Sequence, residues 1–408
     1  MSSSLPTSIA RNAPSGALPL IVSFSDNRWD SGLTGRQHVL SRLARNHDVI
    51  FANPLHDLRA PRGWDKPANW RGRLRRDSSG VRVLEWPAWL GQSYQQRIER
   101  PLLRARQRRL AKFIQRESPD ADPILYVWHP DAWPLIENLP ARLVCYHIYD
   151  HYELLSPKFA TRIAARHAKL AARADRVICV SHGLAERFGG VSDRVHVVPN
   201  GADASHFAQR NLPEPSEIAD LSKRRLMLIA RLNGNYNYRL LHALVSDCQS
   251  PLVIVGPRRG MPAEIERDFD RLLEHPLVRW VGEQPFERLP AFVSHCDIGL
   301  IPYRAGTSSD FASPLKLFEY LAAGKGVIAA NVESVRPYAD QVALADSPEQ
   351  WAAAVERIIA ENNPARIQQR QQLARDNSWD TRVGQIESIL VDALECSGNA
   401  AEGEAIHV

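Results

Sequence analysis

Short apolar runs alternate with segments of helical spacing along most of the chain, and this alternation predicts a parallel α/β protein. Residues 18–24 form the first apolar run, residues 35–46 place apolar side chains at helical spacing, and residues 48–52 form the second run. A strand, a helix and a strand in this order make a βαβ unit, whose two strands pair in parallel. The start of the chain therefore already indicates the fold class.

The same alternation continues in two series that a polar segment separates. In the first series we expect further strands at residues 124–128, 143–148, 177–180 and 195–198. In the second series we expect strands at residues 225–230, 252–256, 278–282, 298–302 and 326–330. Residues 200–220, which lie between the two series, contain Gly201, Pro213 and Pro215, a composition typical of an interdomain linker.

The two series predict two α/β domains, and 408 residues are enough for two domains of about 150–200 residues each. We place the first domain at residues 18–205 and the second at residues 221–375. An amphipathic helix is expected after them, at residues 378–395. Residues 1–17 are rich in Ser, Ala and Pro and predict a disordered N-terminal tail.

Composition adds little to this prediction but excludes several classes of protein. A hydrophobic content of 44% and a charged content of 24% are ordinary for a globular protein. No window approaches 18 continuous apolar residues, so we expect no membrane span, and the N-terminus lacks the pattern of a signal peptide. The five cysteines are isolated, which suits the reducing cytoplasm. The net charge of +5 without a recognition motif argues against nucleic-acid binding.

One segment of the first domain is strongly basic. Residues 94–116 carry seven arginines on a predicted helix: Arg97, Arg100, Arg104, Arg106, Arg108, Arg109 and Arg116. A solvated helix face is the interpretation that we favour. The alternative is a peripheral contact with an anionic membrane on the inner face of the plasma membrane, where each surface cation contributes about 1 kcal/mol.

The most informative stretch of the chain predicts a loop, a short helix, a glycine and a strand, in this order. Within its helix, a cation and a carboxylate lie three residues apart. Lys316 and Glu319 therefore share one face of the helix, near its N-terminus, where backbone N–H groups favour an anion. A phosphate beside a sugar hydroxyl would suit this pair. The alternative is a surface ion pair of a few tenths of a kcal/mol.

The run Ser-Pro-Leu-Lys-Leu-Phe-Glu-Tyr-Leu-Ala-Ala-Gly-Lys-Gly-Val-Ile-Ala, residues 313–329, resembles the nucleotide-sugar signature of GT-B glycosyltransferases, especially those of bacterial exopolysaccharide and teichuronic-acid type. The resemblance implies two doubly wound Rossmann-like domains that face a central cleft. It implies that Lys316 meets the donor phosphate and Glu319 the ribose, with Ser313, Pro314 and Leu315 beside them. Many retaining members carry an acidic residue eight positions before the helix glutamate. Here that position is Phe311.

Three more residues at predicted strand ends are candidates for donor binding. Arg231 follows the first strand of the second domain, where the resembled family has a basic residue that contacts donor phosphates. Gly256 ends the next strand, and glycine permits close approach of a ligand to the backbone. Tyr303 follows the strand before the signature, where an aromatic ring could stack on the nucleobase or stand at the rim without a ligand.

Asp150 is our candidate catalytic base in the first domain. It follows the strand at residues 143–148, and a carboxylate at the carboxyl end of a parallel strand faces the ligand crevice of an α/β sheet. The run Leu-Val-Cys-Tyr-His-Ile-Tyr-Asp-His-Tyr resembles the strand and catalytic aspartate of xanthan-type glucuronosyltransferases. The alternative is an aspartate that caps the following helix.

These features predict a glycosyltransferase that moves a sugar from a nucleotide-diphosphate donor to a saccharide or lipid-linked acceptor. No Asp-x-Asp pair stands in a predicted ligand loop and no histidine cluster has metal spacing, so we expect no cofactor and metal-independent donor binding. A nucleotide-sugar epimerase or a phosphorylase of the same architecture remains an alternative. So does a non-catalytic nucleotide-sugar-binding protein. A dehydrogenase is less favoured because the glycine fingerprint of dinucleotide sites is missing.

Overall fold

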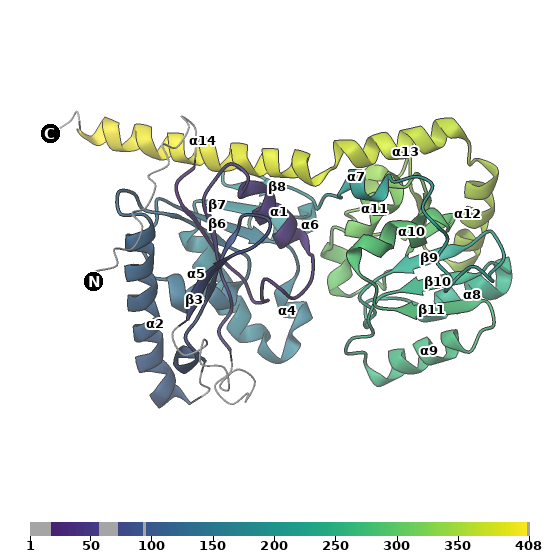
Figure 1. Ribbon diagram of the computed structural model, residues 1–408, viewed down its shortest axis with the longest axis horizontal. Coiled ribbons are helices and arrows are strands. Elements are labelled where there is room, and N and C mark those ends of the chain that lie inside the picture. Colours follow the sequence, from purple (N-terminus) through teal and green to yellow (C-terminus); the bar gives the residue numbers. More distant parts are fainter. Residues whose placement is uncertain (1–17, 57–71, 93–94, 406–408) are drawn as a thin grey trace, which may run out of the picture.

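The computed structural model describes residues 18–56, 72–92 and 95–405, so the predicted N-terminal tail at residues 1–17 lies outside the described residues. Two α/β units lie side by side in Figure 1, one built from the first half of the chain and one from the second. The predicted fold class is confirmed, because each unit is a mostly or wholly parallel sheet with helices on its faces.

The first domain holds an eight-stranded sheet of order β3-β4-β2-β1-β5-β6-β7-β8. Its strands are β1 (Ile21–Phe24), β2 (Val49–Ala52), β3 (Arg73–Arg76), β4 (Arg82–Glu85), β5 (Ile124–Val127), β6 (Leu143–Ile148), β7 (Arg176–Cys179) and β8 (Val195–Val197). All neighbours pair in parallel except β3 and β4, which form an antiparallel pair at the edge. This edge pair was not predicted, since Arg73–Arg76 shows no apolar run.

Helices cover both faces of this sheet. They are α1 (Gly35–Leu43), α2 (Gln96–Glu117), α3 (Trp133–Ile136), α4 (Tyr152–Leu155), α5 (Ala160–Arg173) and α6 (His182–Glu186). The basic segment predicted as a helix is α2, which stands at the outer flank of the domain (Figure 1). One-turn helices labelled η connect some of these elements, among them η2 (Ala88–Leu90).

The second domain holds a six-stranded parallel sheet of order β11-β10-β9-β12-β13-β14. Its strands are β9 (Leu226–Ile229), β10 (Leu252–Val255), β11 (Val278–Gly282), β12 (Ile298–Ile301), β13 (Gly326–Ala330) and β14 (Ala343–Ala345). Its helices are α7 (Ala204–Phe207), α8 (Tyr238–Cys248), α9 (Ala263–Leu273), α10 (Leu289–Ser294), α11 (Leu315–Ala322), α12 (Pro348–Ala360) and α13 (Pro364–Asp376).

The segment predicted as a linker contains a structured element. Helix α7 begins after Asp203, whose carboxylate accepts a hydrogen bond from the backbone N–H of His206. Phe207 is fully buried in the core of the second domain. The residues that join the sheets therefore also pack onto the second one, and they bring polar side chains close to α11.

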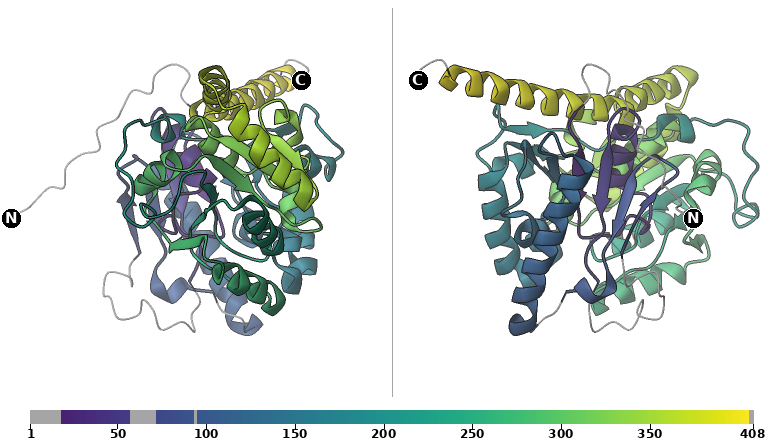
Figure 2. Two further views of the ribbon diagram at one scale, coloured as in Figure 1. Left: turned by 90° about the vertical axis from the view of Figure 1, so that its right-hand side faces the viewer. Right: turned by 60° about the vertical axis from the view of Figure 1, so that its left-hand side comes forward.

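The last helix returns to the first domain. Helix α14 (Trp379–Ala405) runs from the end of α13 across the top of the first domain in Figure 1, and both views of Figure 2 show it along the same edge. Trp379, Val383, Ile386 and Leu390 are buried in a cluster with residues of α1 and the first sheet. Among the described residues, no helix combines the length and apolar character that crossing a bilayer requires.

Candidate active site

Helix α11 presents the predicted donor pair to the first domain. Leu317, Tyr320 and Leu321 are fully buried and fix the helix on the second sheet. The Nζ atom of Lys316 lies 2.6 Å from Oε2 of Glu319, so the predicted pairing on one helix face is confirmed. The side chain of Glu319 is only 7% exposed. A largely buried pair of this kind is more than a surface ion pair.

Burial raises the pKa of Glu319, whereas the ammonium group of Lys316 beside it lowers that pKa. A carboxylate held in this way can accept hydrogen bonds from hydroxyl groups, and the ammonium can meet an anion. No side chain caps α11, so its first backbone N–H groups point out of the helix N-terminus without a capping partner. The local chemistry suits a ligand that carries both hydroxyls and negative charge.

Two elements that the sequence did not connect complete the surroundings of this pair. His206 on α7 stacks on Phe286 at 4.3 Å between ring centroids, and its charge influences Glu319. From the first domain, His38 on α1 approaches Phe286 at 6.1 Å. Burial is the main cause that lowers the pKa of His38 to about 3, with Arg42 next, so this imidazole is neutral near pH 7.

The loop before α11 ties the two domains together. The side-chain oxygen of Ser313 accepts a hydrogen bond from the backbone N–H of Asn200 at 3.0 Å, and its carbonyl accepts one from the Asn200 amide at 2.7 Å. Pro314 occupies the N-cap position of α11 in an extended conformation. Leu315 packs against the apolar cluster that contains α14. These three signature residues position the helix in the structure, and no ligand contact is needed to explain them.

Arg231 stands at the carboxyl end of β9, in the second domain. It is exposed and forms no hydrogen bond or ion pair with the described residues. Gly256 ends the adjacent β10 with a φ of +134°, and a Cβ atom there would lie 1.9 Å from the carbonyl oxygen of Ala230. Glycine is thus required by the packing of two strand ends. Arg231 remains available as a cation beside this edge.

Tyr303 belongs to the second domain and lies close to Asp150 of the first. It pairs with Tyr236 through an isolated backbone bridge, and their ring centroids are 5.5 Å apart. Burial raises the pKa of Tyr303 well above its ordinary value, and the negative charge of Asp150 raises it further. The ring predicted to stack on a nucleobase is therefore engaged with another tyrosine and stands close to the candidate base.

Asp150 lies two residues beyond β6 and reaches across the domain boundary. Its Oδ1 accepts a hydrogen bond from the backbone N–H of His151 at 2.8 Å. Burial raises the pKa of Asp150 to about 7, and hydrogen bonding by the backbone of His151 and by the hydroxyl of Ser308, a residue of the second domain, partly opposes that rise. The helix-capping alternative is wrong, because the residue at the N-cap of α4 is His151.

Ser308 is the residue of the second domain that influences the pKa of Asp150. It belongs to the short helix η6 (Ser308–Phe311), and its hydroxyl oxygen accepts a hydrogen bond at 3.2 Å from the amide of Asn235. Asn235 lies in the loop between β9 and α8, close in sequence to Arg231. The residue whose hydroxyl lowers the pKa of Asp150 is therefore hydrogen-bonded to the loop that carries Arg231, the candidate phosphate ligand.

Phe311, at the position where many retaining relatives have an acid, makes an aromatic contact across the boundary. Its ring centroid lies 4.9 Å from that of His151, and its carbonyl accepts a hydrogen bond from Ser181 at 2.8 Å. The neighbouring Asp310 accepts a hydrogen bond from the backbone of Gly306, within its own loop. Neither residue places a free carboxylate where the retaining pattern has one.

A polar cavity that the sequence did not reveal lies in the first domain, at the sheet edge where Asp150 follows β6. It has a volume of about 200 Å³ and lies at the carboxyl ends of β1, β2 and β5. Its polar lining includes Asp26, Asn53, Gln92, His129 and Asp131. The phenol of Tyr149 donates to Asp26 at 3.1 Å, so the residue before Asp150 forms part of its surroundings. Asp26 follows the first predicted strand, which was the available signal for this site.

Residues 37–206 match the family described as Glycosyltransferase Family 4, and residues 223–361 match Glycosyl transferases group 1. The two matches occupy the two domains in turn and together span most of the chain. The chain is a GT-B glycosyltransferase. Among the described residues, no group of three or more His, Cys, Asp or Glu side chains is arranged as metal ligands.

One relative and two solved structures illustrate what this glycosyltransferase is similar to. TuaH, a glycosyltransferase provisionally assigned to teichuronic acid biosynthesis in Bacillus subtilis (strain 168), is 27% identical over 235 residues, 55% of this chain and 58% of TuaH. The UDP-forming α,α-trehalose-phosphate synthase from Burkholderia xenovorans gives a TM-score of 0.64 at 14% identity, over 91% of this chain and 98% of that one. Anabaena HepE, in complex with UDP, gives 0.61 at 16% identity, over 92% and 100%. The two structures show the shared fold.

Proposed function

We propose that this glycosyltransferase moves a sugar from a nucleotide-diphosphate donor to a saccharide or lipid-linked acceptor in the biosynthesis of a polysaccharide or glycoconjugate. The observation that carries the proposal is the largely buried pair of Lys316 and Glu319 on α11, whose charged atoms lie 2.6 Å apart. The name of TuaH supports a role in polysaccharide synthesis, and the UDP bound to HepE supports a uridine nucleotide.

The second domain binds the donor in this proposal. Glu319 accepts hydrogen bonds from the ribose hydroxyls, and Lys316 exchanges part of its contact with Glu319 for the diphosphate. Arg231 provides a second cation from the end of β9. Charge that develops on the departing diphosphate is stabilised by cations that the bound donor already contacts, so Lys316 and Arg231 lower the barrier to its departure.

Asp150 acts as the general base in the first domain. It removes the proton from the acceptor hydroxyl as that oxygen attacks the anomeric carbon of the donor, and the bond from this carbon to the diphosphate breaks. A base is most effective when its pKa lies close to the working pH, and a pKa of about 7 meets this condition. The acceptor sugar occupies the polar cavity lined by Asp26 and His129, beside Tyr149.

We propose that donor binding needs no metal ion, because Lys316 and Arg231 supply positive charge where the diphosphate would lie. Activity that vanishes with a chelator and returns with added Mn²⁺ or Mg²⁺ would contradict this part of the proposal.

The function is tested by product analysis with a panel of nucleotide sugars, each with and without saccharide acceptors. Thermal-shift screening selects the donor first, because a ligand that binds only the folded state raises the midpoint of unfolding. Formation of a glycosidic bond that depends on both substrates supports transfer. Conversion of the donor sugar without an acceptor would favour an epimerase, and binding without any turnover would favour a nucleotide-sugar-binding protein.

A further inference from the structure

The polar cavity of the first domain has a lining that divides into an apolar part and a polar part. Its volume of about 200 Å³ corresponds to about seven water molecules at about 30 Å³ each, which is room for about one sugar ring. The apolar part includes Phe24, Leu55, Trp86 and Leu135, and most of the polar side chains follow β1, β2 and β5. A pocket of this composition binds a compact ligand through a few fixed polar groups.

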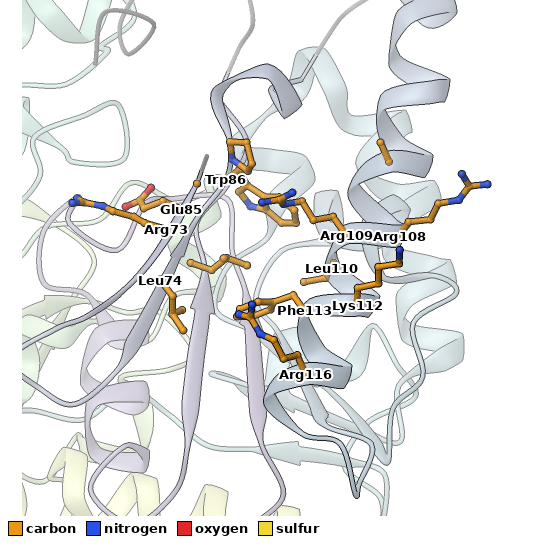
Figure 3. A pocket seen from close by; sticks show the side chains of 14 residues that line it. Arg73, Leu74, Glu85, Trp86, Arg108, Arg109, Leu110, Lys112, Phe113 and Arg116 are labelled. Carbon is orange, nitrogen blue, oxygen red and sulfur yellow. The ribbon is translucent and has the colours of Figure 1, made fainter. Parts of the chain in front are cut away.

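Trp86 is a fixed part of the apolar wall. Figure 3 shows its ring between the end of β4 and helix α2, where it also lines the groove beside that helix, and the residue is only 7% exposed. Its indole N–H donates to the carbonyl of Asn53 at 2.7 Å. The Oδ1 atom of Asn53 accepts from the backbone N–H of Trp29, and its Nδ2 donates to Glu85, each at 2.8 Å. Trp86 and Asn53 therefore shape the cavity, and other residues must meet the hydroxyl groups of a ligand.

His129 offers the cavity a hydrogen-bond donor. Its Nδ1 accepts a hydrogen bond from the backbone N–H of Asp131 at 3.2 Å, so the neutral ring carries its proton on Nε2. Burial lowers the pKa of His129, and the negative charges of Asp26 and Asp131 partly oppose this shift. The residue is only 8% exposed, it lines the cavity, and its Nε2 has no hydrogen-bond partner among the described residues. This N–H can donate to a hydroxyl oxygen of a ligand.

Asp26 offers the complementary acceptor. Its Oδ1 accepts hydrogen bonds from the phenol of Tyr149 and the hydroxyl of Ser25, both at 3.1 Å, and from the guanidinium of Arg36 at 3.3 Å. Among the described residues, its Oδ2 receives one hydrogen bond, from the amide of Asn27 at 3.0 Å. The side chain is 32% exposed, and a carboxylate has about four lone-pair sites, so a ligand hydroxyl can still donate to it.

The charge in the lining is negative. It includes the carboxylates of Asp26 and Asp131, and none of the described lining residues is a lysine or an arginine. The cations that balance these carboxylates lie outside the lining: Arg36 pairs with Asp26, and Arg162 and Arg166 pair with Asp131. An acidic ligand in the cavity would therefore meet like charge, whereas a ligand with hydroxyl groups would meet acceptors and a donor.

We infer that the cavity binds the acceptor sugar as one neutral ring and discriminates against a uronic acid at that position. Asp26 accepts a hydrogen bond from one hydroxyl of the ring, and His129 donates to another through Nε2. The apolar wall that includes Trp86 packs against the C–H groups of the ring. This inference rests on the proposed function, since it names the class of acceptor sugar, but the cavity can be tested without donor or turnover.

The test is a titration of the full chain with methyl glycosides, followed by saturation-transfer difference NMR. The methyl glycosides of glucose, galactose and mannose are each compared with the uronic acid that differs only by oxidation at C6. We expect saturable binding of at least one neutral glycoside, and its uronic acid should bind about tenfold more weakly or worse. A uronic acid that binds as well as its neutral counterpart would overturn the inference, and so would the absence of saturable binding by all three neutral glycosides.

Two substitutions assign the binding to this cavity. Asp26→Asn removes a carboxylate and leaves the cation of Arg36 beside the lining, so the preference for the neutral ring over its uronic acid should fall about tenfold or more. His129→Phe keeps an aromatic ring without the N–H group and should weaken binding of the neutral ring about tenfold.

Matched controls make the same two changes at exposed positions outside the lining. Asp193→Asn and His182→Phe should bind both kinds of glycoside as the unchanged protein does. Thermal unfolding shows whether each variant is folded, and either lining variant is sufficient for the test. An unchanged preference in Asp26→Asn, an unchanged affinity in His129→Phe, or an equal change in the matched control would overturn the inference.

Steady-state kinetics with an acceptor distinguish a failure of this inference from a failure of the proposed function. If transfer occurs and both lining substitutions leave the KM for the acceptor unchanged, the inference is overturned and the proposed function stands. If the cavity binds neutral glycosides and no nucleotide sugar is turned over with any acceptor, the proposed function fails and the sugar site stands by itself.

Discussion

The two domains build their halves of the site in different ways. In the second domain, the residues proposed to hold the donor lie mostly in one short segment, where Ser313 to Glu319 form a loop and the first turns of α11. In the first domain, the surroundings of Asp150 come from distant parts of the chain: its neighbour Tyr149 donates a hydrogen bond to Asp26, and Ser308, which lowers its pKa, belongs to the other domain. A local motif therefore identifies the donor half, whereas only the folded chain assembles the acceptor half.

This difference is also one of charge. The donor half pairs a cation with a carboxylate at 2.6 Å and keeps that carboxylate paired. In the acceptor half, no cation of the described residues pairs with the carboxylate of Asp150, and burial raises the pKa of this carboxyl to about 7. The first arrangement suits binding of a charged ligand, and the second suits the transfer of a proton.

The substitution with the largest expected effect impairs the acceptor half and leaves the donor half unchanged. Asp150→Asn should lower the rate of transfer by about 10² or more, because the amide cannot accept the proton of the acceptor, while the stabilisation by UDP stays unchanged. The measurement is kcat together with the UDP-induced shift in the midpoint of unfolding. Asp193→Asn, at an exposed position of the same domain, is the matched control. Near-normal turnover of Asp150→Asn would remove this residue from the mechanism.

The converse change weakens the donor half. Lys316→Met should reduce affinity for UDP by about 10- to 100-fold, the equivalent of one charge-assisted hydrogen bond. It should also lower the stability of the free protein, because Glu319 then loses its cation while it stays buried. Calorimetric titration with UDP gives the affinity. Lys223→Met removes a lysine that is 75% exposed and should leave that affinity unchanged.

The pH dependence of activity should reflect the acceptor half. Because the base must be ionised, kcat/KM should rise with pH through the pKa of Asp150, about 7, and then level off. The same raised pKa means that native Asp150 keeps a proton which the unfolded chain has already released. Stability therefore falls as pH rises from about 4 to about 7, and Asp150→Asn should remove this fall. A rate that is flat between pH 5 and 8 would contradict this assignment.

The smallest effect is expected at the contact between the halves. The Ser308 hydroxyl lowers the pKa of Asp150 through a hydrogen bond, so Ser308→Ala should move the acidic limb of the kcat/KM profile to higher pH. One neutral hydrogen bond corresponds to a shift of about one unit or less. Ser205→Ala, at an exposed site, should leave the profile in place. A shift of the acidic limb to lower pH in Ser308→Ala would contradict the claim that this hydroxyl lowers the pKa of Asp150.

The sequence predicted those parts whose pattern is local. Alternating apolar runs placed most strands, among them the run at residues 143–148, which forms β6 with the same bounds. The β3–β4 pair was missed because a sheet edge tolerates the run Arg-Leu-Arg-Arg, which has no apolar pattern. Helix α7 was missed because its stability comes from burial of Phe207 rather than from its own four residues.

The candidate site shows the same division. The pairing of Lys316 and Glu319 could be predicted from their spacing, and the candidate role of Asp150 from its place after a strand. The surroundings of Asp150 could not be predicted, since Asp26 and Tyr149 are 123 residues apart in sequence and Ser308 lies in the other domain. For Gly256 the sequence predicted close approach of a ligand; the structure shows the backbone of Ala230 close to this glycine, and the ligand contact stays a prediction.

The most direct test of the roles proposed for the two domains is a crystal structure of the chain with UDP bound. We predict that the diphosphate contacts the ammonium of Lys316 and the guanidinium of Arg231, that the ribose lies against Glu319, and that the nucleotide leaves the cavity beside Asp26 empty. A diphosphate bound in the first domain, or far from both Lys316 and Arg231, would contradict the account.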